Sequence, residues 1–268
     1  MRLTKHHGLG NDFLVLTDHA GIYPATPAIA QAACDRHRGI GADGLLRLSP
    51  GTAGADISMV LLNANGSRAE MSGNGIGCLA QAAVLAGMAS PPVVRVSTDA
   101  GHRTVEIRAG EAPRTHVASV DMGAAAIGDD EPEWLDAETL RAVRVSVGNP
   151  HLVLQAADAE LLRDRGWIVR LGQTANSAIP AGINVEVIAV GDRPDELLMD
   201  VYERGVGLTL ACGTGAAAAA AAARQWELVG DRVTVQMPGG PTEIDLSGPQ
   251  IRMTTPITYV GTVEFPWP

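Results

Sequence analysis

The chain has 268 residues, of which 46% are hydrophobic, 19% charged and only 3% aromatic, so its core must be built mainly from Ala, Val, Leu and Ile. A net charge of −10 without clustered Lys and Arg argues against a nucleic-acid partner. There is no secretory-signal pattern and no apolar run long enough to cross a bilayer, so we expect a cytoplasmic protein with no membrane partner.

The predicted elements are mostly short strands of β-branched residues bounded by Gly, Pro and Asp. In chain order, the sequence predicts a helix at 27–37, a helix at 75–87, strands at 93–97 and 104–108, a partial helix at 137–143, strands at 143–147 and 185–190, a helix at 215–228 and a strand at 233–237. The helix at 215–228 opens with an unbroken alanine run from Ala216 to Ala223, and this run has no polar face, which is typical of a buried helix.

The chain contains an internal duplication. The segment GNDFLVL at 10–16 recurs as GNPHLVL at 148–154, an offset of 138 residues (148 − 10), and SGNG at 72–75 recurs as CGTG at 212–215, an offset of 140 (212 − 72). A period this long suits two domains rather than a solenoid. We therefore predict an α+β (α/β) fold with two pseudo-symmetric domains, 1–115 and 116–268, each a strand-rich, barrel-like sheet around a central helix. The last strand is expected to be able to return to the N-terminal half.

Both short glycine motifs lie where a predicted central helix begins. A helix N-terminus offers unpaired N–H groups and partial positive charge, and the glycines let a ligand approach the main chain, so a carboxylate would be held well there. The same field lowers the pKa of a nearby thiol, which predicts that Cys212 is a thiolate at neutral pH and the catalytic base. One such motif alone would more often be a tight turn, but two copies with reactive side chains favour a site.

Further motifs extend this pattern along the whole chain: KHHGLGNDF at 5–13, NANGS at 63–67, GNPH at 148–151, GINV at 182–185, ERGVG at 203–207 and ACGTG at 211–215. As a set they resemble the diaminopimelate epimerase family. The resemblance implies that the active site lies in the cleft between the two domains and works without pyridoxal phosphate, another cofactor or a metal. In this family one cysteine removes the α-proton and a second, on the opposite face, returns a proton, which converts LL- and meso-diaminopimelate.

The resemblance also assigns roles to single residues. Cys212 matches one catalytic cysteine and Ser72 occupies the place of the other, while His151 and Glu203 match residues that help the thiol chemistry. The implied substrate-binding residues are Asn11, Asn63, Asn149, Asn184, Glu203 and Arg204, with backbone N–H groups toward the reacting carboxylate from Gly73, Asn74, Gly213 and Thr214.

Three positions depart from the family pattern. The Ser72 hydroxyl is far less acidic than a thiol, so it can donate a proton or hold water but is a poor base without an adjacent partner. Leu208 stands where the family commonly has Glu, and Gly77 stands where it commonly has Arg. Together the two changes remove one charge of each sign, as the loss of an ion pair would. The other cysteines, Cys34 and Cys78, are predicted to be buried in packing.

The sequence therefore predicts cofactor-independent epimerisation of LL-diaminopimelate to meso-diaminopimelate in lysine and peptidoglycan precursor biosynthesis, with activity reduced by Ser72. The resemblance implies a homodimer that takes a small amino-acid substrate. Two alternatives stay open. One is a related racemase, isomerase or dehydratase acting on another amino acid, and the other is a ligand-binding relative that lost turnover through Ser72.

Overall fold

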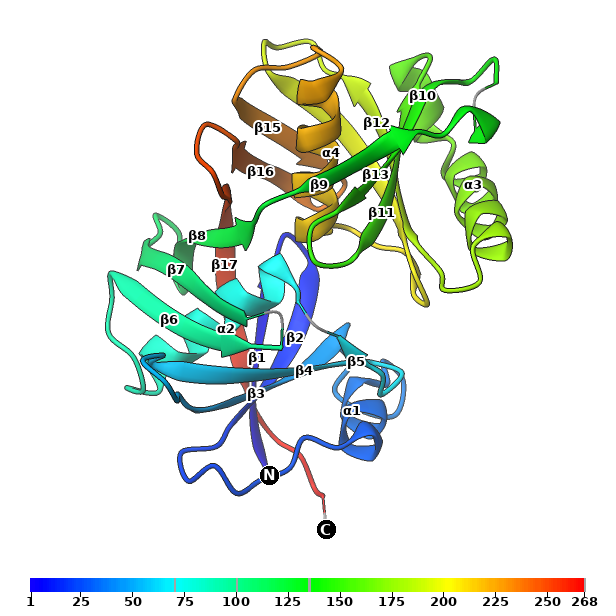
Figure 1. Ribbon diagram of the computed structural model, residues 1–268. Coiled ribbons are helices and arrows are strands. Elements are labelled where there is room, and N and C mark those ends of the chain that lie inside the picture. Colours follow the sequence, from blue (N-terminus) through cyan, green and yellow to red (C-terminus); the bar gives the residue numbers. More distant parts are fainter. Residues whose placement is uncertain (70, 100, 135, 268) are drawn as a thin grey trace. The chain divides into compact units, whose positions relative to one another are not determined.

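The computed structural model describes residues 1–69, 71–99, 101–134 and 136–267 (Figure 1). The chain divides into two compact units. Unit 1 is Met1–Asp121 together with the C-terminal segment from Thr254, and unit 2 is Met122–Met253. The chain passes between the units inside two strands, β8 (Thr115–Gly123) and β17 (Ile251–Glu264), so the division lies a few residues beyond the expected one at 115.

Unit 1 is a closed ring of strands around a helix. The ring runs through β1 (Arg2–Gly8), β2 (Asn11–Thr17), β3 (Gly44–Pro50), β4 (Ile57–Asn63), β6 (Val93–Thr98), β7 (Gly101–Ala109), β8 and β17, and β17 pairs with both β8 and β1. The short strand β5 (Arg68–Ala69) adds to β4, and helix α1 (Pro27–Cys34) connects β2 to β3. Helix α2 (Gly73–Leu85) contacts β1, β2, β3, β4, β6 and β7, and is buried from Gly73 to Ala83.

Unit 2 repeats this plan. Its main strands are β9 (Ala126–Asp130), β10 (Thr139–Ser146), β11 (Pro150–Ala156), β12 (Asn184–Val190), β13 (Glu196–Glu203), β15 (Arg232–Met237) and β16 (Gly240–Asp245), with the short β14 (Gly207–Leu208) beside β13. Two 3-10 turns, Pro132–Trp134 and Ala159–Arg163, and helix α3 (Arg165–Ala178) join them. Helix α4 (Gly213–Gln225) is buried from Gly213 to Ala223, because a surface of methyl groups lets strands approach closely.

The strand directions confirm the predicted duplication. Along β1–β2–β3–β4–β6–β7 the pairings are antiparallel, parallel, antiparallel, parallel and antiparallel, and the series β10–β11–β12–β13–β15–β16 has the same order. Helices α1 and α3 occupy equivalent connections, as do α2 and α4. The five predicted strands are confirmed as β6, β7, β10, β12 and β15, and three of the predicted helices as α1, α2 and α4 with shifted ends.

The partial helix predicted at 137–143 is wrong. Most of this segment belongs to β10, which pairs with β11 on one side and with β9 on the other. From Val143 onward the strand alternates between buried and exposed residues, as a half-buried strand does. Pairing on both sides therefore overrides the local helix propensity of the alanine, glutamate and leucine that precede Val143.

Helix α3 was not predicted. The Asp164 side chain accepts a hydrogen bond from the Trp167 N–H at 3.1 Å and so caps its first turn. Glycines within the helix lower its intrinsic propensity. One of them, Gly172, is required by packing, because a Cβ there would lie 2.2 Å from Cγ of Tyr202. None of the helices in the described part of the chain combines the length and apolar character needed to span a membrane.

Candidate functional site

The two central helices begin with equivalent caps. Ser72 and Cys212 both have extended backbones, with φ of −147° and −131°. The Ser72 Oγ accepts a hydrogen bond from the Gly75 N–H at 3.0 Å, and the Cys212 Sγ accepts one from the Gly215 N–H at 3.4 Å. The predicted pair therefore occupies matching positions, one in each unit, and each helix start has backbone donors suited to a carboxylate.

The Cys212 thiol lies in a buried and acidic environment. Its residue is only 6% exposed. Burial and the charges of Glu203 and Glu186 raise the pKa of the thiol well above its ordinary value, and the hydrogen bonds from Thr214 and Gly215 do not offset them. The prediction that Cys212 is a thiolate at neutral pH is therefore wrong, because desolvation and two carboxylates outweigh the helix N-terminus.

A chain of hydrogen bonds connects Cys212 to His151. The Thr214 Oγ1 lies 3.5 Å from the Cys212 Sγ and accepts a hydrogen bond from the Asn149 Nδ2 at 3.3 Å. The Asn149 Oδ1 is 3.0 Å from the His151 Nε2, and the His151 Nδ1 is 2.8 Å from the Glu186 Oε1. His151 and Glu186 are both fully buried. The structure thus joins three predicted site residues to the cysteine and places a carboxylate behind them.

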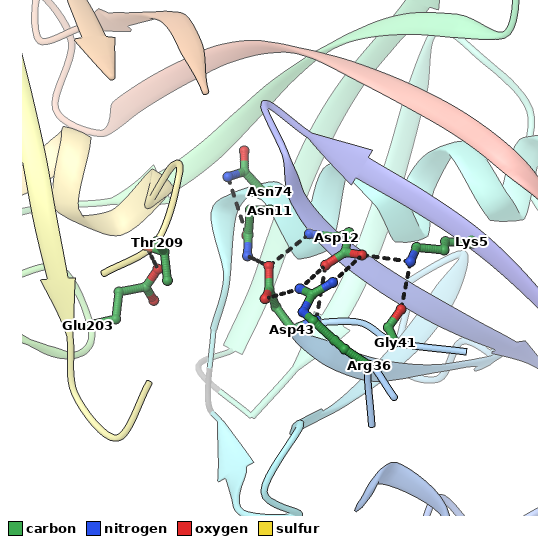
Figure 2. A network of polar contacts seen from close by, with 9 residues as sticks. All are labelled: Lys5, Asn11, Asp12, Arg36, Gly41, Asp43, Asn74, Glu203 and Thr209. Atoms are coloured by element: carbon green, nitrogen blue, oxygen red, sulfur yellow. Dashed lines mark hydrogen bonds and ion pairs between the residues drawn. The ribbon is translucent and has the colours of Figure 1, made fainter. Parts of the chain in front are cut away.

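The remaining candidates of unit 2 lie at strand ends. Asn184, at the start of β12, accepts a hydrogen bond from the Arg204 N–H at 2.9 Å and donates to the Pro150 carbonyl oxygen at 3.3 Å. The Glu203 Oε1, at the end of β13, accepts a hydrogen bond from the Thr209 hydroxyl at 2.5 Å (Figure 2). The Arg204 guanidinium is exposed, which suits capture of a carboxylate.

In unit 1, Asn11 is held in one orientation (Figure 2). Its Nδ2 donates to the Asp43 Oδ2 at 2.9 Å, and its Oδ1 accepts a hydrogen bond from the Asn74 Nδ2 at 3.4 Å. Asn74 also lies in the first turn of α2, two residues after Ser72. The structure therefore connects one predicted substrate-binding side chain directly to the predicted carboxylate-binding turn.

Behind Asn11 lies an ionic network, also drawn in Figure 2. Asp12 pairs with Lys5 at 2.8 Å and with Arg36 at 2.7 Å, and Arg36 also pairs with Asp43 at 2.7 Å. Burial alone would raise the pKa of Asp12, but the hydrogen bonds and charges of Arg36 and Lys5 hold it below its ordinary value. The network contains two carboxylates and two cations, so its net charge is zero while it holds the Asn11 side chain in place.

Asn63 lies opposite Gly44, the residue after Asp43, in the pairing of β3 and β4. It ends β4, and its Nδ2 donates to the Ser67 Oγ at 3.0 Å within a turn. Its role in substrate binding therefore stays a prediction.

Sequence reasoning missed Asp43 and Glu186. Asp43 directly precedes β3, and its contact with Asn11 is made across two neighbouring strands. Glu186 is the one charged residue of strand β12, among valine, isoleucine and alanine neighbours that flank or follow it, and this position was its only signal in the sequence. Both side chains support neighbouring polar groups, and such support depends on tertiary contacts.

The departures from the family pattern are packed within their own units. A Cβ at Gly77 would lie 2.8 Å from the Ile257 Cδ1, so this position has no room for a larger side chain without rearrangement. Leu208 packs against an apolar cluster that includes Trp167.

Cys34 and Cys78 are buried, as predicted. Burial is the main reason that the pKa of Cys34 rises to about 12, and burial also raises the pKa of Cys78. No cluster of three or more His, Cys, Asp and Glu side chains able to hold a metal occurs among the described residues.

The comparisons of sequence agree on one family. The family model described as diaminopimelate epimerase matches residues 3–127 and 143–260. A diaminopimelate epimerase from Cyanothece sp. (strain PCC 7425) is 39% identical over 283 residues, which cover 97% of this chain and 98% of that protein. One from Pelotomaculum thermopropionicum is 37% identical over 285 residues and covers 100% of this chain and 99% of its own.

Solved structures share the fold at low sequence identity. A phenazine biosynthesis protein of the PhzF family from Bacillus anthracis matches with a TM-score of 0.73 at 14% identity, covering 98% of both chains. A hydroxyproline epimerase from Agrobacterium vitis matches with a TM-score of 0.69 at 17% identity, covering 98% of this chain and 91% of its own. These likenesses concern the fold alone.

Proposed function

Because this chain belongs to the diaminopimelate epimerase family, we propose that it interconverts LL- and meso-diaminopimelate by proton transfer at the α-carbon, as an isomerase of amino-acid biosynthesis. The observation that carries the proposal is the pair of equivalent helix caps, Ser72 and Cys212, each at the start of a buried helix. We propose that the two caps act on opposite faces of one substrate.

The helix starts supply the electrostatic part of the reaction. Removing an α-proton leaves an electron pair that spreads from the α-carbon onto the carboxylate. Backbone N–H groups of Gly73, Asn74, Gly213 and Thr214 would bind that carboxylate and stabilise its growing charge. A well-placed donor of this kind is worth roughly 10²–10³ in rate.

Cys212 is the proposed base, and its raised pKa sets a requirement for the substrate. Glu203 and Glu186 oppose the thiolate electrostatically. An α-ammonium group bound beside Glu203 would offset one of these charges and favour deprotonation of the thiol. The thiolate would then take the α-proton, forming an S–H bond, and the electron pair of the C–H bond would pass to the substrate.

Ser72 is the proposed proton donor on the other face. Its hydroxyl, or a water molecule that it holds, would return a proton to the α-carbon. Since a hydroxyl is a poor base, proton transfer at Ser72 is the more difficult of the two transfers, and it slows the reaction in both directions. Ser72 is also the feature that favours the second candidate, a ligand-binding relative without turnover.

The other polar side chains would hold the far end of the substrate. Asn149 and Asn184 offer amide donors and acceptors for an ammonium and a carboxylate, and Arg204 offers a two-pronged contact to a carboxylate. Asn11 and Asn63 complete the proposed set from unit 1. We further propose, from the family resemblance, that the reaction needs no pyridoxal phosphate and that the protein acts as a cytoplasmic homodimer.

The test is incubation of the protein with meso-diaminopimelate in D₂O, with α-deuterium incorporation and LL-isomer formation followed separately. We expect both, with Ser72 or its water as the second proton carrier. Exchange without the LL-isomer would leave Cys212 as a one-sided base. Binding without exchange would support the ligand-binding relative, and exchange only with proline or another amino acid would support a different racemase and overturn the diaminopimelate assignment.

An Asp43→Ala substitution tests the support of Asn11. The Asn11 amide would lose its 2.9 Å acceptor, and we expect KM for diaminopimelate to rise about tenfold while kcat stays within about twofold, since one hydrogen bond is lost. Steady-state kinetics measure both values. The control is Asp56→Ala, which removes an exposed carboxylate that accepts a hydrogen bond from the Arg95 N–H at 2.7 Å. An unchanged KM in a folded Asp43→Ala protein contradicts the positioning of Asn11.

A further inference from the structure

Thr209 is a polar side chain to which the proposed reaction gives no role. It follows the short strand β14, and its hydroxyl donates a 2.5 Å hydrogen bond to the Glu203 Oε1 (Figure 2). Thr209 is partly buried and lies in the same unit as Glu203. An O–H hydrogen bond of this length to a carboxylate is charge-assisted and strong, so it holds one oxygen of Glu203 in place.

The segment that carries Thr209 is fixed by its neighbours in the fold. Strand β14 pairs with the end of β13, with Leu208 opposite Tyr202 and Gly207 opposite Glu203. Leu208 also packs against an apolar cluster formed in part by helix α3. The distance from the Thr209 hydroxyl to Glu203 is therefore set by strand pairing and packing.

An ion pair anchors the same segment from helix α3. Arg165, the first residue of α3, pairs with Asp200 on β13 at 3.3 Å, and its Nη2 donates to the Thr209 carbonyl oxygen at 3.5 Å. Asp200 is only 4% exposed, and burial raises the pKa of its carboxyl group, although the charge of Arg165 opposes this shift. A buried carboxylate without a partner costs free energy, so Asp200 keeps Arg165 at this position. The carbonyl contact is long and weak, so strand pairing is the main anchor.

Glu203 is a group whose orientation matters to the site. After burial, its charge is the largest cause of the raised pKa of the Cys212 thiol, so the carboxylate lies within electrostatic reach of the sulfur. A glutamate side chain has several rotatable bonds and loses rotamer freedom when it binds a cation. A hydrogen bond that orients the carboxylate before the substrate arrives removes part of this loss from the binding step.

We infer that Thr209 is a positioning residue for Glu203, whose carboxylate it holds in the orientation that receives the α-ammonium group of the substrate. Strand β14 and Arg165 keep Thr209 in place for this task. Thr209 acts through Glu203, so it affects the binding of the substrate rather than the transfer of its proton. The inference rests on the proposed function in taking Glu203 as the group that receives the ammonium.

The first measurement titrates Glu203 without substrate. Its carboxyl NMR signal, in protein carrying isotope-labelled glutamate, is assigned by its loss in Glu203→Gln. Thr209→Val keeps the shape of the side chain but removes the donor to the charged carboxylate. We expect the Glu203 midpoint to move to higher pH, with about fivefold more protonated carboxyl at a fixed pH above both midpoints. The Cys212 thiol has a raised pKa, so it stays neutral through this range.

Two further variants serve as controls. Thr209→Ser keeps the hydroxyl and should keep the Glu203 midpoint. Thr139→Val makes the same chemical change on β10 of the same unit, at a buried hydroxyl that has no hydrogen-bond partner among the described residues. It should also leave the midpoint unchanged, because its hydroxyl does not bond to Glu203.

The second measurement separates positioning from chemistry. In α-proton exchange of diaminopimelate, KM in Thr209→Val should rise about fivefold while kcat stays within about twofold, because the ammonium contact is made in the ground state as in the transition state. Thr209→Ser should retain the unmodified KM. A hydroxyl that only stabilised the segment 203–209 would change the free energy of unfolding and leave the Glu203 midpoint unmoved.

An unmoved or lower midpoint in folded Thr209→Val overturns the inference, and so does a rise of the same size in Thr209→Ser. A raised midpoint with an unchanged KM also overturns it, because the hydrogen bond then does not serve binding. If Thr209→Val does not fold, Thr209→Ala is read in the same way. If the unmodified protein exchanges no diaminopimelate, the proposed function fails, while the substrate-free titration still decides whether Thr209 holds Glu203. Normal exchange with an unmoved midpoint overturns only the inference.

Discussion

In a Ser72→Cys variant, epimerisation of diaminopimelate should be faster than in the unmodified protein by about 10²-fold or more, because a thiol replaces a hydroxyl at the second proton-transfer position. The Ser72 Oγ accepts the Gly75 N–H as the Cys212 Sγ accepts the Gly215 N–H, so a cysteine at 72 needs no change of backbone. The gain in kcat/KM should be equal in the two directions, because a catalyst does not change the equilibrium constant between the isomers.

The measurement is the initial rate from each isomer, with α-deuterium incorporation recorded in parallel. A Ser72→Ala variant is the matched control, since it removes the hydroxyl and should be slower than the unmodified protein. If Ser72→Cys folds and binds diaminopimelate yet is no faster in either direction, residue 72 is not the second proton carrier.

A Cys212→Ser variant is expected to lose α-proton exchange by about 10³-fold, since proton abstraction passes from a thiolate to a hydroxyl of far lower acidity. The raised pKa of Cys212 gives this reaction a pH dependence. The thiolate is the active form, so exchange in the unmodified protein should increase as pH rises toward the pKa of the thiol, and this rise should disappear in the variant.

Cys34→Ala serves as the control for Cys212→Ser. Cys34 lies in the core of unit 1, and burial raises the pKa of its thiol to about 12, so its removal should leave the pH dependence of exchange intact. Exchange that persists in folded Cys212→Ser at the unmodified rate assigns the base to another group.

The sequence alone was enough to predict the duplication and the positions of its two helix starts. Glycine motifs at a fixed offset and an alanine run without a polar face are local patterns, and each has one simple structural explanation. Helix α3 begins 138 residues after α1 (165 − 27), so the repeat offset could have predicted it. The glycines in α3 lower its helix propensity, so the local sequence did not indicate a helix. The strand at 139–146 was misjudged, since pairing with β9 and β11 outweighs local propensity.

The ionisation of Cys212 and the support of Asn11 depend on contacts between distant parts of the chain. The helix N-terminus is visible in the sequence, but burial and the approach of Glu203 and Glu186 depend on strands far apart in the chain, and together they reverse the direction of the pKa shift. In the same way, Asp43 reaches Asn11 only because β2 and β3 are parallel neighbours. Electrostatic effects depend on distance and desolvation in space, and these quantities are set by packing rather than by any local pattern.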